Sequence, residues 1–372
     1  MKAAIGLDFQ ISDAPHTQGI KYTGSKLRLL PYIIALAQKT NSKHIFDGFA
    51  GTTRVSQAFA KSNFTVTAND SAIWSKVFAE CFLLNNKPKD YYQEIIAHLN
   101  SLLPRTGWFT ENYGADARGI ENKKRPFQKH NMMKLDAIRD EIDSIAISGP
   151  ERSVLLTSLI LALDKVDSTL GHYASYLRNW SERSFNTFEM KVPELLDNNR
   201  KHNVFCANIF DILNDVEADI AYFDPPYGSN NEKMPPSRVR YSAYYHFWKS
   251  VVLNDKPKLF GKANRREDSR DIVNSSIFEE FRKDQNDNFI AVEALRELIA
   301  KVKAPHVILS YSSGGRATAE NLFEIIEDSG EIADFIKVNY KQNVMASMRW
   351  TNDWIRETKK PNQEFLFLIK KK

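Results

Sequence analysis

Four consecutive residues, Asp224-Pro225-Pro226-Tyr227, have the types needed to present an amine for chemical attack. They follow the apolar run 220–223, which is typical of a buried strand. Because proline has no backbone donor, the strand must end here and the loop is stiff. The Asp224 carboxylate and the Pro225 carbonyl could accept both hydrogens of an exocyclic amine on a planar base, on which the Tyr227 ring could stack. Ordinary turns contain the same residue types, so these residues alone do not decide between a site and a turn.

A glycine-containing turn is a second candidate for ligand binding. Residues 44–46 are typical of a strand, and a helical pattern follows the turn. A strand, a glycine turn and a helix place free backbone amides against a nucleotide-like ligand. The spacing differs from GxGxxG, so the turn by itself is only weakly indicative. It consists of Asp47, Gly48, Phe49, Ala50, Gly51 and Thr52.

An acidic residue at the end of the next predicted strand supports the same interpretation. Residues 65–68 are β-prone and end at Asn69-Asp70, about 20 positions after the glycines, where a ribose diol is commonly bound. The alternative is that Asp70 only caps the helix that begins near Ala72. The combined spacing favours a ligand site.

A short motif near the N-terminus precedes a helical pattern over residues 27–37. Ser25 could cap this helix, and the free amides of the first turn would then bind an anion. A plain capped helix is the alternative, and for these residues alone it is the better interpretation. The motif consists of Tyr22, Thr23, Gly24, Ser25 and Lys26.

The order of the predicted elements indicates an α/β fold. Four more β-prone runs predict one seven-stranded, mostly parallel sheet, with helices on both faces and a ligand at the carboxyl ends of the strands. Between residues 88 and 200 this alternation stops and helical patterns dominate. We predict a catalytic domain of residues 1–87 and 201–372, and a mainly helical insertion of residues 88–200. The four further β-prone runs are 204–207, 307–310, 335–340 and 364–370.

The composition is that of an ordinary globular protein, with 42% hydrophobic and 26% charged residues. No apolar run approaches the roughly 20 residues that span a bilayer. The first 19 residues lack the pattern of a secretory signal, and Cys81 and Cys206 form neither a disulfide framework nor a metal site. We therefore expect a cytoplasmic protein with no bound metal. The net charge of +5 permits a polyanionic partner without requiring one.

In their order and spacing, these motifs resemble those of S-adenosylmethionine-dependent amino-methyltransferases of DNA, most of all the Dam-type adenine-N6 group. That group has the lysine-containing motif, the glycine turn, the acidic strand end, an inserted recognition domain and the Asp224 loop in this order. Residues 309–315 also resemble a late motif of the group. The resemblance covers most of the chain outside the insertion, and it implies a Rossmann-like methyltransferase sheet with a target-recognition domain inserted into it.

The resemblance also implies roles for individual residues. Asp70 would bind the ribose hydroxyls of S-adenosyl-L-methionine, and Asp224 and Pro225 would bind the target amine while Tyr227 stacks on adenine. Asn208 stands where the group often has an acid near the cofactor's adenine, and its amide can still accept and donate hydrogen bonds. The remaining cofactor contacts would come from Tyr22, Gly24, Ser25, Lys26, Asp47, Gly48, Phe49, Ala50, Gly51, Thr52 and Asp224.

The expected mechanism is direct transfer of the methyl group to the amine. The target base must be flipped out of the duplex, which costs a few kcal/mol. Because the cofactor is itself a strong electrophile, the protein's task is placement and electrostatics, with no covalent intermediate.

Double-stranded DNA is therefore the expected partner, read by the insertion and by the loop at 228–245 that follows Tyr227. For each basic candidate, ordinary surface charge is the better interpretation, and none of the candidates identifies the base that it would read. The candidates are Lys26, Lys123, Lys124, Arg125, Arg178, Arg238, Arg240, Tyr241 and Tyr244.

Three other functions stay open. Cytosine-N4 methyltransferases use the same geometry but tend to have serine where Asp224 stands. RNA guanine-N2 methyltransferases can have a similar loop, but the large insertion and the Lys26 motif favour DNA. A DNA-binding module that has lost catalysis is the third, and the presence of Gly48, Gly51, Asp70 and Asp224 disfavours it. The sequence leaves open whether a cognate restriction endonuclease, acting separately, is a further partner.

Overall fold

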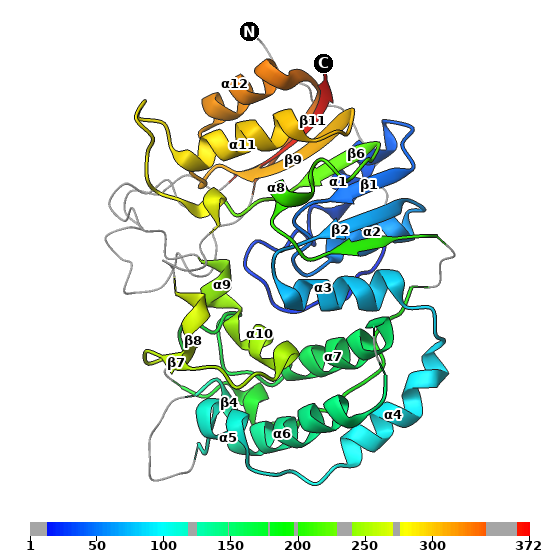
Figure 1. The fold of residues 1–372 in the computed structure, drawn as a ribbon, viewed down its shortest axis with the longest axis vertical. Coiled ribbons are helices and arrows are strands. Elements are labelled where there is room, and N and C mark those ends of the chain that lie inside the picture. The colour runs from blue at the N-terminus through cyan, green and yellow to red at the C-terminus, as the bar shows by residue number, and fades with distance from the viewer. Residues whose placement is uncertain are drawn as a thin grey trace.

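The computed structural model describes residues 13–117, 125–147, 149–177, 179–196, 200–228, 240–270, 276–339 and 363–372. A sheet covered by helices forms one body, and a group of helices forms a second body beside it (Figure 1). Within these ranges no helix is long and apolar enough to span a bilayer.

Seven strands form the main sheet, in the order β10-β11-β9-β6-β1-β2-β5. Neighbouring strands from β9 to β5 are parallel, and β11 runs antiparallel to both of its neighbours. The mostly parallel seven-stranded sheet predicted from the sequence is thereby confirmed. Its strands are β1 (His44–Asp47), β2 (Thr65–Asn69), β5 (Asn203–Phe205), β6 (Ile220–Phe223), β9 (His306–Ser312), β10 (Gly330–Asn339) and β11 (Gln363–Lys371).

Alternate residues of the central strands pack against helices on opposite faces of the sheet. In β6, Ile220 and Tyr222 lie in one apolar cluster with α1 and α2, whereas Ala221 and Phe223 lie in another with α11 and α12. Because both faces are covered, the strand is apolar throughout instead of alternating. The covering helices are α1 (Leu30–Gln38), α2 (Arg54–Lys61), α11 (Ile290–Lys301) and α12 (Ala319–Ser329).

The chain changes direction across the sheet at β1, and this places two predicted loops side by side. Strand β2 lies on one side of β1 and β6 lies on the other. Asp47 is in register with Tyr222, and the Gly48 amide donates to the Tyr222 carbonyl at 3.0 Å. The glycine turn and the Asp224 loop therefore leave the same edge of the sheet, where open α/β sheets bind ligands.

The helical body has an apolar core of its own, and helix α10 contributes Trp248 and Val251 to it. Arg139 of α6 is fully buried and donates to the carbonyls of Val251 (2.6 Å) and Val252 (2.9 Å) at the end of α10. This body therefore includes a segment from outside residues 88–200, and the domain boundaries stay a prediction. Its helices are α4 (Lys89–Ser101), α5 (Trp108–Tyr113), α6 (Lys129–Ser144), α7 (Gly149–Leu163) and α10 (His246–Leu253), and α3 (Ile73–Ala79) packs against them.

Two local predictions are wrong. Helix α1 begins at Leu30 with Leu29 as its N-cap, so Ser25 does not cap it; the Ser25 amide instead donates to the Tyr22 carbonyl in a turn, at 3.3 Å. A proline in the first turn of α1 supplies a helical φ without needing a hydrogen-bond partner. In the predicted loop at 228–245, residues Tyr241–Tyr244 form the short helix α9.

Candidate active site

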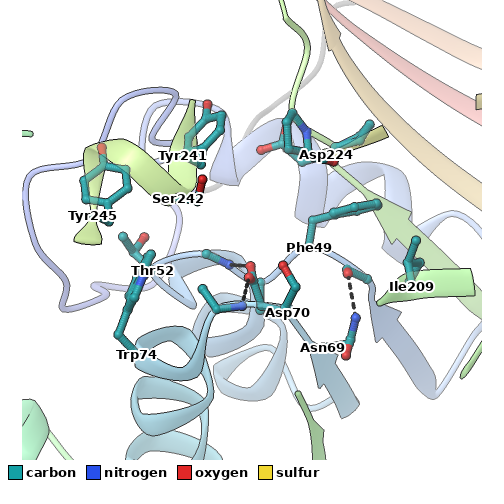
Figure 2. Close-up of a pocket in the computed structure, with 18 of the residues that line it drawn as sticks. Phe49, Thr52, Asn69, Asp70, Trp74, Ile209, Asp224, Tyr241, Ser242 and Tyr245 are labelled. Atoms are coloured by element: carbon teal, nitrogen blue, oxygen red, sulfur yellow. Dashed lines mark hydrogen bonds between the residues drawn. The ribbon is translucent and has the colours of Figure 1, made fainter. Parts of the chain in front are cut away.

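A cavity of about 540 Å³ opens at the carboxyl ends of β1, β2 and β6. Figure 2 shows Asp70 and Asp224 on the loops of the sheet, with Tyr241, Ser242 and Tyr245 on the other side of the cavity. The volume suits a nucleotide-sized ligand. Every predicted cofactor contact except Asp47 lines it, namely Tyr22, Gly24, Ser25, Lys26, Gly48, Phe49, Ala50, Gly51, Thr52, Asp70, Asn208 and Asp224.

Asp70 holds the glycine turn against the start of α3. Its Oδ2 accepts the Gly51 amide and its Oδ1 accepts the Ala72 amide, both at 2.8 Å (Figure 2). Gly51 has a φ of +49°, a left-handed conformation that favours glycine. Burial raises the pKa of Asp70, and the two amide bonds lower it. Because each carboxylate oxygen can accept a second bond, Asp70 can position the turn and still bind a diol.

Asp47 lies beneath the glycine turn and is not among the residues that line the cavity. It is fully buried, and its Oδ2 accepts the Ser56 hydroxyl of α2 at 2.5 Å. Its Oδ1 has no hydrogen-bond partner in the part of the chain that the structure describes. Burial raises the pKa of Asp47 to about 7. The structure thus gives Asp47 a contact between β1 and α2, and its predicted cofactor contact stays a prediction.

Two asparagines organise the loop after β5: Asn69 connects it to the glycine turn, and Asn208 caps the helix that follows it. Asn69 donates to the carbonyls of Gly48 (3.3 Å) and Ala207 (3.2 Å), and it accepts the Ala207 amide at 3.1 Å. Asn208 accepts the Phe210 amide at 3.1 Å and so caps the short helix α8 (Ile209–Ile212). Asn208 lines the cavity, and its contact with the cofactor's adenine stays a prediction.

Asp224 belongs to a group of four polar side chains, Lys26, Asp224, Tyr227 and Glu364, called the lysine cluster below. The Lys26 Nζ lies 2.9 Å from Asp224 Oδ1, 3.0 Å from Glu364 Oε1 and 2.5 Å from the Tyr227 hydroxyl. The Tyr227 hydroxyl also contacts both carboxylates, Asp224 Oδ1 and, at 2.7 Å, Glu364 Oε1. The structure therefore brings the two predicted motifs together and adds Glu364, which no sequence motif indicates.

The lysine cluster sets the acidity of Asp224. Burial raises the pKa of Asp224 to about 6, the Lys26 ammonium lowers it and the Glu364 carboxylate raises it. Burial alone would lower the pKa of Lys26, but the two carboxylates raise it above its usual value. Near neutral pH Lys26 is therefore charged and Asp224 is largely ionised. Two carboxylates and one ammonium give the cluster a formal charge of −1.

The Tyr227 ring is turned toward this cluster and packs on Tyr311, with ring centroids 4.8 Å apart. Among the described residues, Asp224, Pro225 and Pro226 line the cavity and Tyr227 does not. The role of Tyr227 in stacking stays a prediction.

Four aromatic side chains form one wall of the cavity. Tyr22 stacks on Tyr245 with centroids 4.6 Å apart, and its ring lies 5.4 Å from that of Tyr241 and 5.8 Å from that of Trp74. The Thr23 amide donates to the Tyr245 hydroxyl at 2.8 Å, which fixes the N-terminal motif to this wall. Trp74 and Tyr245 are not among the site residues predicted from the sequence. The aromatic run that contains Tyr245 is a signal for that residue.

Two residues predicted to contact DNA are buried and do not line the cavity. The Arg240 Nη1 donates to the Glu279 carbonyl at 2.6 Å. Tyr244 stacks on His172 with centroids 4.3 Å apart. Both placements suit a structural role better than a contact with DNA, and the DNA-binding role stays a prediction.

The other described candidates differ in their placement. Lys26 is buried but lines the cavity, Tyr241 also lines it, and Arg125 is half-buried beside Tyr176. Four candidates lie outside the described residues, namely Lys123, Lys124, Arg178 and Arg238.

The sheet topology, with a cavity at the strand ends and an acidic residue after β2, defines a Rossmann-like methyltransferase. A family model narrows the class further. The chain belongs to the D12 class N6 adenine-specific DNA methyltransferases, whose family model matches residues 22–297. This confirms the resemblance drawn from the motifs.

The chain is similar to several named methyltransferases. The chain is 29% identical over 337 residues to the modification methylase StsI of Streptococcus sanguinis, covering 87% of this chain and 48% of that protein. It is 29% identical over 329 residues to the modification methylase LlaI of Lactococcus lactis, covering 82% and 48%. It is 27% identical over 332 residues to the type II methyltransferase M.NlaIII of Neisseria lactamica, covering 87% and 92%. The chain thus spans about half the length of StsI and LlaI and nearly all of M.NlaIII.

Proposed function

We propose that this chain transfers a methyl group from S-adenosyl-L-methionine to the N6 amine of adenine in a short duplex DNA sequence. One observation supports this most strongly: Asp224, on the stiff loop after β6, faces the same cavity as Asp70 and the glycine turn. An acceptor for an amine hydrogen and a nucleotide-type turn therefore share one space. Membership of the D12 family supports adenine N6 as the amine.

The residues around the cavity fit S-adenosyl-L-methionine. Asp70 keeps free lone pairs for ribose hydroxyls, and the aromatic wall offers faces to planar or cationic groups. The formal charge of −1 on the lysine cluster suits a neighbouring sulfonium. When bound, S-adenosyl-L-methionine supplies an activated methyl group on a positively charged sulfur.

Asp224 and Pro225 would bind the two amine hydrogens and so orient the nitrogen lone pair toward the methyl group. A stacked adenine cannot place its amine in this cavity, so the base must leave the duplex. Lys26 favours the ionised form of Asp224, in which both oxygens accept hydrogen bonds. Placement and electrostatics thus supply the catalysis.

The relatives StsI and LlaI are named modification methylases. We therefore propose a modification role for this chain, in which a restriction endonuclease of the same specificity would act separately. The helical body and the segment after Tyr227 would read the sequence. Plasmid DNA from cells that express the chain should then resist an endonuclease that cuts the same sequence only when it is unmethylated.

The central test uses purified chain, methyl-labelled S-adenosyl-L-methionine and duplex DNA that lacks methylated adenine. Nucleoside mass spectrometry should find N6-methyladenine, and methylation-aware sequencing should place it in one sequence context. Asp224→Ala is the control, and it should bind S-adenosyl-L-methionine but leave the DNA unlabelled. Label on cytosine N4, label on RNA alone, or cofactor binding without any label would contradict the proposal.

A further inference from the structure

Glu364 is a buried carboxylate that lies far from every sequence motif of the site. It stands near the start of β11, in register with Ser312 of β9, and its side chain is 10% exposed. Its Oε1 lies 3.0 Å from Lys26 Nζ, 2.7 Å from the Tyr227 hydroxyl and 3.2 Å from the Ser310 hydroxyl. A buried carboxylate needs such partners, and here two of the three also bind Asp224.

The donors of the lysine cluster are shared between the two carboxylates. The Tyr227 hydroxyl has one hydrogen, so at any moment it donates to Asp224 or to Glu364. The Lys26 ammonium has three hydrogens and contacts both carboxylates and the Gly24 carbonyl, which lies 3.2 Å away. Each donor therefore has a second anionic partner already in place.

A target amine would donate to Asp224 as well. In binding the amine, the carboxylate could turn away from Lys26 and Tyr227, which contact its Oδ1 in this structure. If Asp224 were the sole anion, its loss as a partner would leave the Lys26 ammonium buried without a counter-ion, which is strongly unfavourable. With Glu364 in place, Lys26 and Tyr227 keep an ionic partner when Asp224 turns to the amine.

We propose that Glu364 is a positioning residue for methyl transfer, which retains Lys26 and Tyr227 while Asp224 binds the target amine. This inference rests on the proposed function. In the transfer step the new nitrogen–carbon bond forms as the carbon–sulfur bond breaks, and the positive charge passes from sulfur to nitrogen. Asp224 lies where it can take the proton that the nitrogen then releases. The second carboxylate keeps the surroundings formally negative while that positive charge moves.

The proposal has a consequence for pH dependence. The groups whose charges act on Asp224 are Lys26, which lowers its pKa, and Glu364, which raises it, while the Tyr227 hydroxyl donates to it. The other titratable neighbours are Asp47, Tyr22, Tyr222 and Tyr241, which stay unchanged in the variants below. Neutralising Glu364 should therefore lower the pKa of Asp224 and move the acid limb of the rate profile to lower pH.

The test compares Glu364→Gln with Glu331→Gln in the full chain. Glu331 is an exposed residue of β10 that pairs with Lys370 at 3.5 Å, so it is a matched control for the loss of one carboxylate. For Glu364→Gln we expect kcat on duplex DNA to fall about tenfold or more, the effect of one hydrogen bond between charged groups. The affinity for S-adenosyl-L-methionine should fall less than kcat does, because the contacts of Asp70 are untouched and only the charge near the sulfonium changes. Glu331→Gln should behave as wild type.

Glu364→Asp separates charge from reach, because it keeps the carboxylate on a shorter side chain. It should leave the acid limb near its wild-type position, with a kcat between those of wild type and Glu364→Gln. An unchanged kcat and pH profile in Glu364→Gln would overturn the proposal. So would parallel losses of melting temperature, cofactor affinity and kcat in both variants, which would show a structural role. A wild-type chain that methylates no DNA would instead refute the proposed function itself.

Discussion

Replacement of Lys26 by methionine should destabilise the folded chain in a pH-dependent manner. The Lys26 side chain is 6% exposed and contacts the carboxylates of Asp224 and Glu364 at 2.9 Å and 3.0 Å. Methionine has a similar length and no charge, so Lys26→Met leaves both carboxylates buried without a cation. One of them should then bind a proton at a higher pH than in the wild-type chain.

The size of the effect follows from the geometry. At an effective dielectric constant of about 20, Coulomb's law gives about 6 kcal/mol for unit charges 2.9 Å apart. The ammonium also loses its hydration on burial, and breaking buried pairs of this kind reduces the free energy of unfolding by about 3–5 kcal/mol. When the pKa of a carboxyl group is raised in the folded state, the free energy of unfolding decreases as pH rises toward and through that pKa. The deficit of Lys26→Met should therefore be small near pH 5 and complete near pH 8.

Melting temperatures at pH 5 and pH 8 test this reasoning, with Lys283→Met as the control. Lys283 is exposed and pairs with exposed Asp287 at 2.9 Å, a surface pair that contributes about 0–1 kcal/mol. We expect Lys26→Met to melt roughly 5 °C or more below wild type at pH 8 and the control to melt near wild type. An equal deficit of Lys26→Met at both pH values would refute the assignment of the loss to unpaired carboxylates.

Three further predictions concern activity. Asp224→Asn should lower kcat by about 10²–10⁴-fold without loss of cofactor affinity, because the amide carries no charge and accepts through one atom only. Rapid-quench methylation measures kcat, and calorimetry measures the affinity. Asp70→Asn should raise the Kd for S-adenosyl-L-methionine about tenfold or more, because the NH₂ group of asparagine would face the Gly51 or Ala72 amide, donor against donor. Titration calorimetry measures this Kd, and an unchanged value would contradict the prediction. In the wild-type chain kcat should fall as pH decreases through about 6, where Asp224 takes up a proton, and a rate flat from pH 8 to pH 5 would argue against its role.

The sheet could be predicted from the sequence because its strands are short, apolar and followed by turn residues. The run 220–223 is an example, since burial on both faces leaves it apolar throughout. The start of α1 could not be predicted in the same way. Ser25 has the right residue type for a cap, but the chain first makes a turn in which the Ser25 amide bonds to the Tyr22 carbonyl.

The candidate site divides along similar lines. Asp70 and Asp224 carry local signals, because each follows a predicted strand at an informative spacing. Glu364 carries none, since its partner Tyr227 is 137 positions away and the pairing exists only after β11 inserts next to β9. The orientation of Tyr227 is equally invisible in the sequence, because it depends on that distant carboxylate and on the packing of its ring against Tyr311.

Helix α10 limits how this chain could be engineered. An exchange of residues 88–200 between relatives would supply a foreign α6, while the native carbonyls of Val251 and Val252 would still require the guanidinium of Arg139. A hybrid joined at residues 88 and 200 would leave mismatched surfaces inside one apolar core. Moving α10 together with the insertion would keep that core intact, so the transplantable unit is two separate stretches of chain.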